Sequence, residues 1–562
     1  MSNDRSRINF FSLLAFLALG VLVARIAYLQ LWQGDFFTEF AGNQAKGVIE
    51  STRGRGFILD VNGDPLALNK KSASLYVFAS EINDRKVFVR KLQNAGLKLS
   101  KNTITRILKN DGFVWIERNI DIDQAEKIQK QIPNVEYLLE EQRLYPERKL
   151  AASIVGFTGT DNKGLGGLEN RYEKILQGHK LQLLSLKDNK GKRIVFEDTR
   201  KEKEIDTQLY LTIDKYLQGL SEEVLREDTE KFMAKRGIAV AMDAYTGDII
   251  FAASSGGFDP NEYGKYSRSE WKNYPAGYLY EPGSIFKPVL FSLLMDKHNL
   301  NMREMVNCEN GKYKLYDHVV KDVHPFQILT ARQVMLHSSN IGTMKLSDKV
   351  TKKEFYQYMK EAGFGEKTGV SGLGEEEGIL RSTEQWSGLS KPSISIGQEV
   401  MVTPLQMVRF YSAIANGGRL VNPKIVSKVE NGGNIYRPKY VQKRIFSEET
   451  AKALQSLLSD VVTDGTGSNA QSSFVPIAGK TGTGQRIDSE TGTYSKKEYV
   501  ASFAGVFPAD NPRIAMLVVY QEPKKSIYGG STAAHTFKTL AEQLSMQLGL
   551  KRSYVYESLP AS

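Results

Sequence analysis

The stretch "YEPGSIFKPVL", residues 280–290, places a serine and a lysine three positions apart, where a Pro-Gly turn gives way to an apolar run. Pro282 and Gly283 are expected to end a loop, Ser284 to cap a helix, and the residues that follow have the apolar spacing of a buried helix. Residues i and i+3 share one face of a helix, so the Lys287 amine can reach the Ser284 hydroxyl and, when neutral, remove its proton. The stretch therefore predicts a serine nucleophile with a lysine base.

This pair is weak evidence when taken alone. The segment "SEWK", Ser269 to Lys272, shows the same spacing by accident. Two further short motifs follow in the chain, "SSN" at Ser338 to Asn340 and "KTGT" at Lys480 to Thr483. Each also arises by chance in a long sequence, so the order and the structural context of the three must decide.

The tripeptide "KTG" occurs twice in this chain. Lys367 to Gly369 lie in the glycine-rich segment "GFGEKTGVSGLGEEEG", which is typical of a loop. The copy at Lys480 follows a strand pattern, and the neighbouring pattern "EYVASFAGV" predicts a second strand that would hold the first rigidly. We therefore interpret Lys480 as the functional copy.

Five apolar segments predict the strands of one antiparallel sheet. They are "GIAVAMDA" (237–244), "DIIFAAS" (248–254), "VPIAGKTGTGQ" (475–485), "EYVASFAGVFP" (498–508) and "PRIAMLVVYQEP" (512–523). A helical insertion that begins with Ser284 separates the first two from the last three, and an amphipathic helix over residues 532–550 closes the chain. The expected fold class is α/β (α+β), a five-stranded antiparallel sheet flanked by helices in α/β/α layers.

The amino terminus predicts a membrane anchor. Residues 8–24 carry no charge, and they follow a tail with Arg5 and Arg7. A helix over residues 8–31 would span the bilayer, with the tail 1–7 in the cytoplasm and the rest of the chain on the extracytoplasmic side. A cleaved signal peptide is the alternative, but no small-x-small site follows the apolar run and Arg25 lies where cleavage needs small residues.

Composition places limits on the remainder of the chain. With 562 residues and a net charge of +11, the chain has room for several domains, and its basic residues are mixed with nearly as many acidic ones. No nucleic-acid-binding signature is present, and Cys308 is the only cysteine, so neither nucleic acid, nor a bound metal, nor another cofactor is expected. The charged segment 187–206 indicates a boundary between a first module, residues 32–205, and a second, residues 206–555.

The ordered set "SIFK", "SSN" and "KTGT" resembles the penicilloyl-serine transferases, which comprise penicillin-binding proteins and serine β-lactamases. Further segments resemble the class B penicillin-binding proteins, and the segment "RLYPERKLAASIVGFTG" is most similar to their septal, cell-division members. The segments are "RGFILDVNGDPLA" (55–67), "GLGGLENRYEKILQG" (164–178), "LTIDKYLQ" (211–218), "MDAYTGDIIFAAS" (242–254), "IGQEVMVTPLQMVRFYSAIANGG" (396–418) and "YGGSTAAHTF" (528–537).

The resemblance implies a penicilloyl-serine transferase domain behind an elongated, non-catalytic α+β pedestal. It implies a D,D-transpeptidase that crosslinks peptidoglycan stem peptides, with a D-Ala-D-Ala donor, an amine acceptor and β-lactams as inhibitors. It also implies a glycan polymerase of the SEDS family and division proteins as partners at the bacterial cytoplasmic membrane.

The resemblance also implies a role for each motif residue. Ser284 would carry the acyl ester, Lys287 would act as its base, Ser338 would relay the proton and Asn340 would orient the amine. Lys480, Thr481 and Thr483 would bind the substrate carboxylate, Gly482 would make room for the peptide, and the backbone N–H groups of Ser284 and Thr483 would form the oxyanion hole. Tyr280 and Glu281 are interpreted as positioning residues and His337 as scaffold.

Other functions stay open at this stage. An elongation-specific class B transpeptidase and a D,D-carboxypeptidase share these motifs. A β-lactamase is less favoured because no "ExxLN" pattern supplies a deacylating glutamate, and a non-enzymatic β-lactam sensor is less favoured because the chain has one apolar anchor rather than several.

Overall fold

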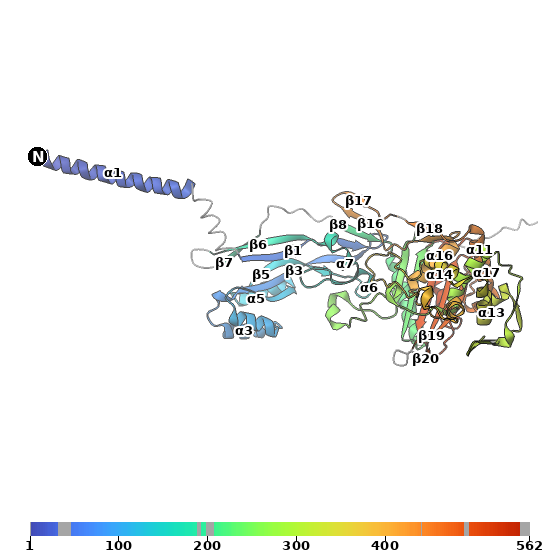
Figure 1. The fold of residues 1–562 in the computed structure, drawn as a ribbon. Helices are drawn as coiled ribbons and strands as arrows, with labels where there is room; N and C mark the ends of the chain where they lie inside the picture. Colours follow the sequence, from blue (N-terminus) through green and yellow to red (C-terminus); the bar gives the residue numbers. More distant parts are fainter. Residues whose placement is uncertain are drawn as a thin grey trace, which may run out of the picture. The chain divides into compact units, whose positions relative to one another are not determined.

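The computed structural model describes residues 2–31, 47–187, 193–197, 207–439, 441–487 and 494–550 (Figure 1). The chain divides into two compact units. The first comprises Met1–Gly54, Lys71–Gln142 and Gly178–Glu204, and the second comprises Arg55–Lys70, Arg143–Gln177 and Ile205–Ser562. The predicted boundary near residue 205 thus differs from the observed division, because two earlier segments fold with the second unit.

The second unit contains the predicted sheet. Its five strands are β9 (Arg236–Asp243), β10 (Ile249–Ser254), β19 (Ala478–Ile487), β20 (Tyr494–Phe507) and β21 (Ile514–Gln521). They pair antiparallel in the order β10-β9-β21-β20-β19. These are the five segments predicted to form one antiparallel sheet, so that prediction is confirmed, and β19 with its "KTGT" motif is an edge strand.

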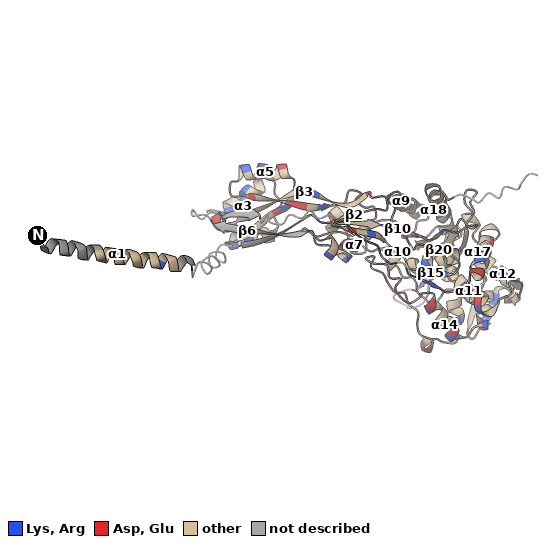
Figure 2. Cartoon of the chain, turned by 90° about the horizontal axis from the view of Figure 1, so that it is seen from above, with Lys and Arg blue, Asp and Glu red and all other residues tan. Residues whose placement is uncertain are grey.

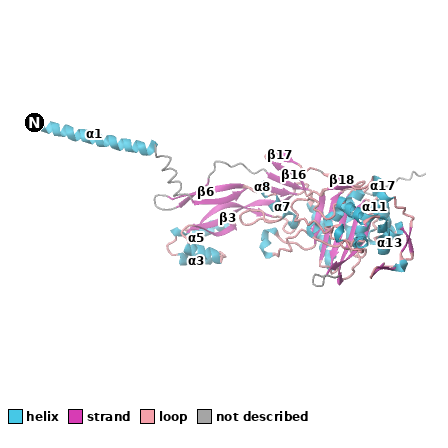
Figure 3. Cartoon of the chain, viewed as in Figure 1, coloured by secondary structure: helices cyan, strands magenta, loops and turns pink. Residues whose placement is uncertain are grey.

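Helices pack against both faces of this sheet, and Figure 3 shows the strands and helices of the second unit in separate colours. One face packs against α9 (Lys215–Lys231) and α18 (Ala533–Gln547) in a core that includes Leu217, Phe251 and Phe537. The other face packs against α16 (Pro404–Ala415) and α17 (Glu448–Thr463), and α11 (Lys287–His298) packs against α17. Every residue of α16 is buried, because this helix lies between the sheet and the other helices. The α/β/α layering is confirmed.

The insertion between β10 and β19 contains short strands as well as helices. Its other helices are α10 (Tyr274–Gly277), α12 (Ala331–Leu336), α13 (Asn340–Leu346), α14 (Lys352–Glu361) and α15 (Ser390–Ser395). It also contains three small antiparallel pairs: β11 (Met305–Asn307) with β14 (Ile328–Thr330), β12 (Lys312–Leu315) with β13 (His318–Lys321), and β15 (Arg419–Val421) with β18 (Gln442–Arg444).

A further sheet of the second unit was not predicted, so the fold has more strands than the five expected. Strand β8 (Thr207–Leu211) pairs with β16 (Val426–Asn431) on one side and, in parallel, with β2 (Phe57–Leu59) on the other. Strand β17 (Asn434–Tyr436) extends β16, and the first residues of β3 (Pro65–Phe78) pair with β2. These pairings explain why residues 55–70 belong to the second unit.

Buried charges lie among the short helices α6 (Ala152–Val155), α7 (Gly167–Arg171) and α8 (Glu173–Leu176) of the second unit. The Glu169 carboxylate accepts hydrogen bonds from the Nε atoms of Arg55 and Arg143, each at 2.6 Å. Because ions are costly to bury unless they are paired, this cluster stabilises a single arrangement of the three segments that supply it.

The first unit contains two groups of strands. Strands β1 (Gly47–Arg53), β6 (His179–Lys187) and β7 (Arg193–Glu197) pair antiparallel. The later part of β3 pairs with β4 (Phe113–Ile120) and with β5 (Glu136–Leu144). Helices α3 (Arg85–Asn94), α4 (Lys101–Lys109) and α5 (Ile122–Gln131) pack with them around Leu75, Leu92 and Ile107. Basic and acidic residues are interspersed along the described chain (Figure 2).

Helix α1 (Ser2–Leu31) begins nearer the terminus than the helix expected over residues 8–31. Most of its described side chains are exposed, with Phe16 at 74% and Val21 at 68%. Within the described residues, none of the helices combines the length and the apolar composition that crossing a membrane requires.

Candidate active site

Ser284 lies in a 3-10 turn, η4 (Gly283–Phe286), immediately before α11. The prediction that Ser284 caps the helix is wrong, since Pro282 and Phe286 occupy the two cap positions and neither has a side-chain cap. Gly283 has a φ of +58°, which favours glycine, and this turn of the backbone carries the serine into η4 rather than to the cap. The half-buried Ser284 hydroxyl is therefore not used for capping.

Lys287 is fully buried and connects α11 to the "SSN" segment. Its Nζ donates to the Ser338 carbonyl oxygen at 2.6 Å and to the Asn340 Oδ1 at 2.9 Å, and it lies 3.2 Å from the Ser338 Oγ. Three contacts of the Lys287 amine thus bring the "SIFK" and "SSN" motifs together.

The "SSN" segment forms the junction between α12 and α13. Ser338 has a φ of +58°, a left-handed conformation that is uncommon for a residue with a side chain. Ser339 caps α13 by accepting from the Gly342 N–H at 2.9 Å, and Asn340 is the first residue of that helix. Ser339 therefore serves as a helix cap, and the side chains of Ser338 and Asn340 contact the Lys287 amine.

Sequence reasoning missed Asp322, which directly follows β13. Its carboxylate accepts from the Ser339 hydroxyl at 2.5 Å, from the Asn340 N–H at 2.6 Å and from the Ile341 N–H at 3.0 Å. These contacts hold the "SSN" turn from the side of a small hairpin. An isolated Asp in a polar hairpin carries no sequence signal for this role, because the contact joins residues 17 positions apart.

Strand β19 carries the third motif. Lys480 is fully buried, and its Nζ lies 3.3 Å from the Thr481 carbonyl oxygen and 3.4 Å from the Thr481 Oγ1. The Thr481 hydroxyl also hydrogen-bonds the Thr466 hydroxyl at 2.8 Å, and Thr483 is half-buried. The strand is held by β20, where Lys480 pairs with Ala504 and Gly482 with Ser502.

The serine segment lies directly against this strand. A Cβ atom added to Gly482 would lie 2.9 Å from the Pro282 carbonyl oxygen and 2.3 Å from the Ser502 Oγ. A Cβ atom added to Gly283 would lie 2.8 Å from the Thr483 carbonyl oxygen. The two backbones are thus so close that neither glycine position admits a side chain without displacement.

Burial lowers the pKa of Lys287 to about 7, and the Asp322 carboxylate opposes that shift. Burial also lowers the pKa of Lys480 well below its usual range, and the nearby charge of Lys287 lowers it further. Burial thus accounts for the low pKa of Lys287, and the repulsion between the two cations adds to the lowering of the Lys480 pKa.

The competing motifs lie elsewhere. Ser269 is exposed and its hydroxyl hydrogen-bonds Ser267 at 2.8 Å. In the second "KTG" copy the Thr368 and Gly369 N–H groups donate to the Glu375 carboxylate at 2.6 and 3.1 Å, outside any strand. His337 stacks on Phe326 with ring centroids 4.8 Å apart, which agrees with a scaffold role.

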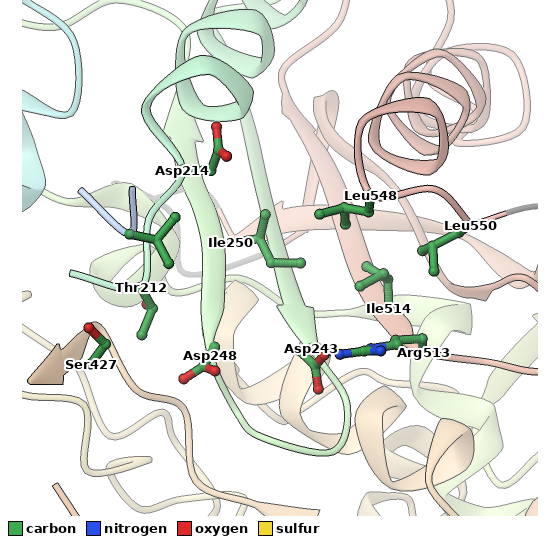
Figure 4. Close-up of a pocket in the computed structure, with 11 residues that line it drawn as sticks. Thr212, Asp214, Asp243, Asp248, Ile250, Ser427, Arg513, Ile514, Leu548 and Leu550 are labelled. Atoms are coloured by element: carbon green, nitrogen blue, oxygen red, sulfur yellow. Dashed lines mark hydrogen bonds and ion pairs between the residues drawn. The ribbon is translucent and has the colours of Figure 1, made fainter. Parts of the chain in front are cut away.

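A separate pocket of about 340 Å³ contains none of the predicted site residues (Figure 4). It is lined by residues including Asp214, Asp243, Asp248, Ile514 and Leu548. Its carboxylates already have partners: Asp243 accepts from the Arg513 Nε at 2.9 Å, Asp248 pairs with the Lys424 Nζ at 2.9 Å, and Asp214 caps α9. These carboxylates therefore stabilise the surrounding fold.

Comparisons with known proteins agree with this architecture. Residues 237–542 match the penicillin binding protein transpeptidase domain, and residues 50–211 match the penicillin-binding protein dimerisation domain. Stage V sporulation protein D of Bacillus subtilis is 30% identical over 97% of this chain and 86% of that protein. The peptidoglycan D,D-transpeptidase FtsI of Escherichia coli is 29% identical over 93% of this chain and 88% of that protein.

A solved structure is also similar. It is penicillin-binding protein 3 from Mycobacterium tuberculosis in complex with aztreonam, with a TM-score of 0.70 and 25% sequence identity. The match covers 90% of this chain and 98% of that one.

Proposed function

This chain belongs to the penicillin-binding proteins that carry a transpeptidase domain and a dimerisation domain, and on that premise we propose how its side chains perform the reaction. The chain is a serine-type peptidoglycan D,D-transpeptidase of class B. It acts on peptidoglycan stem peptides and is a target of β-lactams. We assign the nucleophile to Ser284, and the observation that carries this assignment is the buried Lys287 amine, bonded to Ser338 and Asn340 beside the serine segment.

In the first half-reaction the neutral Lys287 amine takes the Ser284 proton. The serine oxygen then forms a bond to the carbonyl carbon of the penultimate D-alanine. The bond from that carbon to the terminal D-alanine nitrogen breaks, and the nitrogen receives the proton from Lys287 through the Ser338 hydroxyl. The Lys287 amine is neutral again, and the donor peptide is held as an ester on Ser284.

In the second half-reaction the acceptor amine attacks the ester carbonyl. A carbon–nitrogen bond forms, the bond from the carbonyl carbon to the Ser284 oxygen breaks, and the amine proton returns to that oxygen through Lys287. A Lys287 pKa of about 7 suits both directions of transfer at neutral pH. Asn340 keeps the amine aimed at Ser338 by accepting from Nζ at 2.9 Å.

Strand β19 supplies the electrostatic part of the mechanism. The Thr481 and Thr483 hydroxyls, together with the Lys480 amine, suit the terminal carboxylate of the donor. The N–H groups of Ser284 and Thr483 form the oxyanion hole, supported by the close backbone approach at Gly283 and Gly482. A single donor of this kind is typically worth about 3 kcal/mol in transition-state stabilisation.

Labelling with penicillin followed by peptide mass spectrometry tests the assignment. We expect one adduct, on the peptide containing Ser284, and no labelling of a Ser284→Ala variant. The matched control is Ser269→Ala, which removes the other Ser-x-x-Lys serine and leaves labelling unchanged. An adduct on Ser269, or labelling that survives Ser284→Ala, would refute the nucleophile.

Transfer to an amine, rather than hydrolysis alone, can be measured directly. A stem-peptide donor incubated with an amine acceptor should yield crosslinked dimer in the chromatogram. Tetrapeptide as the only product would instead indicate a D,D-carboxypeptidase.

We propose further that helix α1 anchors the chain in the bacterial cytoplasmic membrane, with the catalytic unit outside. The support is the uncharged run 8–24 behind Arg5 and Arg7, and the exposed apolar side chains of α1. Alkaline carbonate extraction of membranes tests this proposal. A chain that lacks residues 1–31 is the control and should be released into the supernatant. Release of the full chain as well would contradict the proposal.

The cellular role we propose is septal peptidoglycan synthesis, with a SEDS-family glycan polymerase and division proteins as partners. The likeness to FtsI and the "RLYPERKLAASIVGFTG" segment support a division role. Depletion of the chain should give filaments. Round cells would instead indicate a role in elongation.

A further inference from the structure

The buried carboxyl group of Glu281 lies three residues before Ser284. Its side chain is 6% exposed. Its Oε1 accepts two hydrogen bonds, from the Glu399 N–H at 2.9 Å and from the Tyr494 hydroxyl at 3.1 Å. Among the residues that the structure describes, its buried Oε2 has no hydrogen-bond partner.

The two donors belong to the two segments that enclose the serine turn. Tyr494 is the first residue of β20 and pairs with Ile487 at the end of β19, so it belongs to the hairpin that presents Thr481 and Thr483. Glu399 lies in the loop between α15 and α16, which Gly397 brings against the serine segment. The Gly283 N–H donates to the Gly397 carbonyl oxygen at 3.0 Å.

The backbone contacts leave little room for these three segments to move independently. A Cβ atom at Gly484 would lie 2.6 Å from the Glu281 carbonyl oxygen, and one at Gly397 would lie 2.2 Å from the Gly283 carbonyl oxygen. Glu399 itself has a φ of +57°, a strained conformation that its neighbours must maintain. The Glu281 carboxyl joins the serine turn, the hairpin and the loop through one oxygen atom.

We propose that Glu281 is a positioning residue that couples the Ser284 turn to the β19–β20 hairpin through Tyr494 and to the 396–403 loop through the Glu399 N–H. This inference rests on the proposed function of Ser284. The coupling sets the separation between the serine oxygen and the Thr483 N–H, on which the tetrahedral intermediate depends. Glu281 itself does not touch the substrate in this role.

The two carboxyl oxygen atoms of Glu281 differ in their hydrogen bonds, and this difference can be tested with two substitutions. Because both hydrogen bonds end on Oε1 and Oε2 has no partner, a glutamine can accept both bonds through its single carbonyl oxygen. Glu281→Gln should therefore preserve the coupling, whereas Glu281→Ala should abolish it. If Glu281 contributed only its negative charge, both variants would lose that contribution and would be equally slow.

The experiment measures the acylation rate constant and the dissociation constant of the preceding non-covalent complex with a fluorescent penicillin. We expect Glu281→Ala to slow acylation about tenfold or more, Glu281→Gln to stay within about threefold of the unchanged chain, and Tyr494→Phe to slow acylation about three- to fivefold. The effects should fall on the acylation step, with the non-covalent complex affected less.

A double-mutant cycle separates coupling from general destabilisation. In the Glu281→Ala background, Tyr494→Phe should have no further effect, because the bond that it removes is already lost. Tyr499→Phe is the matched control: it removes a phenol hydroxyl from the same strand, and the described structure shows no hydrogen bond from that hydroxyl to Glu281. Thermal unfolding of each variant identifies any that fails to fold, and Tyr494→Phe at a partly exposed position retains the test in that case.

Several results would overturn the inference. They are multiplicative effects of Glu281→Ala and Tyr494→Phe, a Glu281→Gln variant as slow as Glu281→Ala, or normal acylation in Glu281→Ala. A failure of the proposed function looks different, since the unchanged chain would then not be acylated on Ser284.

Discussion

The same tripeptide, Lys-Thr-Gly, occurs at residues 367–369 and at residues 480–482, in two different surroundings. At 480–482 it lies in an edge strand paired with β20, with a fully buried lysine and the serine turn against its glycine. At 367–369 it lies in a loop whose N–H groups are bound by Glu375. A Cβ atom at Gly369 would meet nothing closer than the Asn422 Nδ2 at 3.9 Å.

The difference teaches that the tripeptide has no catalytic meaning without a rigid strand and a neighbouring nucleophile. In the strand, the hydrogen bonds of the sheet fix the position of Lys480 relative to Lys287. In the loop, the same tripeptide is held by the Glu375 carboxylate. Each of the following predictions alters one side of this comparison.

The largest effect should come from substitution of Lys480. Lys480→Ala removes a buried amine next to Lys287 and should slow acylation by penicillin about 100-fold or more, as expected for loss of a preorganised electrostatic group. Lys367→Ala is the matched control and should leave the rate unchanged. Equal loss in both variants, measured with a fluorescent penicillin, would contradict the interpretation of the strand copy as the functional one.

Substitution of Gly482 should lower the acylation rate, whereas substitution of Gly369 should lower only the stability of the fold. A methyl group at Gly482 meets the Pro282 carbonyl oxygen at 2.9 Å and the Ser502 Oγ at 2.3 Å, so Gly482→Ala must push β19 away from the serine turn. We expect acylation to fall about 10- to 100-fold. Gly369 has a φ of +91°, so Gly369→Ala should cost roughly 1 kcal/mol of stability through backbone strain and leave acylation intact.

Measured together, acylation kinetics and thermal unfolding separate the two outcomes. A Gly482→Ala variant with a normal acylation rate would show that the close approach of the two backbones is not needed for the reaction. A Gly369→Ala variant with slow acylation would show that the loop copy influences the site.

The pH dependence of acylation should follow the Lys287 amine. Its pKa is lowered to about 7, and the base must be neutral, so the rate should rise with pH through about 7 and fall about tenfold for each pH unit below it. The unfolded lysine has its ordinary, higher pKa, and the unfolded chain therefore binds more protons between the two values. Stability from this group consequently increases with pH over that window. A rate independent of pH between 5 and 8 would argue against lysine as the base.

The sequence predicted the catalytic unit well because its signals are local. The five strands are apolar runs bounded by polar turns, so each was recognisable from its own segment, whereas their order in the sheet was not predicted. The choice of Lys480 over Lys367 also rested on local context, a strand followed by another strand. The contacts of Lys287 with Ser338 and Asn340 were expected from motif order and a resemblance, rather than from spacing.

What the sequence did not predict depends on contacts between distant residues. The parallel pairing of β2 with β8 joins residues about 150 positions apart, and it transfers residues 55–70 to the second unit. The 3-10 turn at Ser284 depends on the packing of Gly283 against Thr483 in β19. Asp322 contacts the "SSN" turn only because a small hairpin folds over it.

Asp322 allows the smallest and most specific change, because it alters the environment of Lys287 without touching either Lys-Thr-Gly segment. Its carboxylate raises the Lys287 pKa against the effect of burial. An asparagine retains a carbonyl oxygen for the Asn340 and Ile341 N–H groups but carries no charge. In Asp322→Asn the midpoint of the acylation pH profile should therefore move to lower pH, by about one unit, while the limiting rate falls only a few-fold.

The direction of that shift distinguishes an electrostatic role from a structural one. If Asp322 only holds the "SSN" turn, the variant would lose rate equally at every pH and the midpoint would stay in place. Asp317→Asn, at the turn between β12 and β13, is the matched control, since it removes one carboxylate from the same hairpin. A midpoint that moves to higher pH in Asp322→Asn would contradict the view that this carboxylate stabilises the charged form of Lys287.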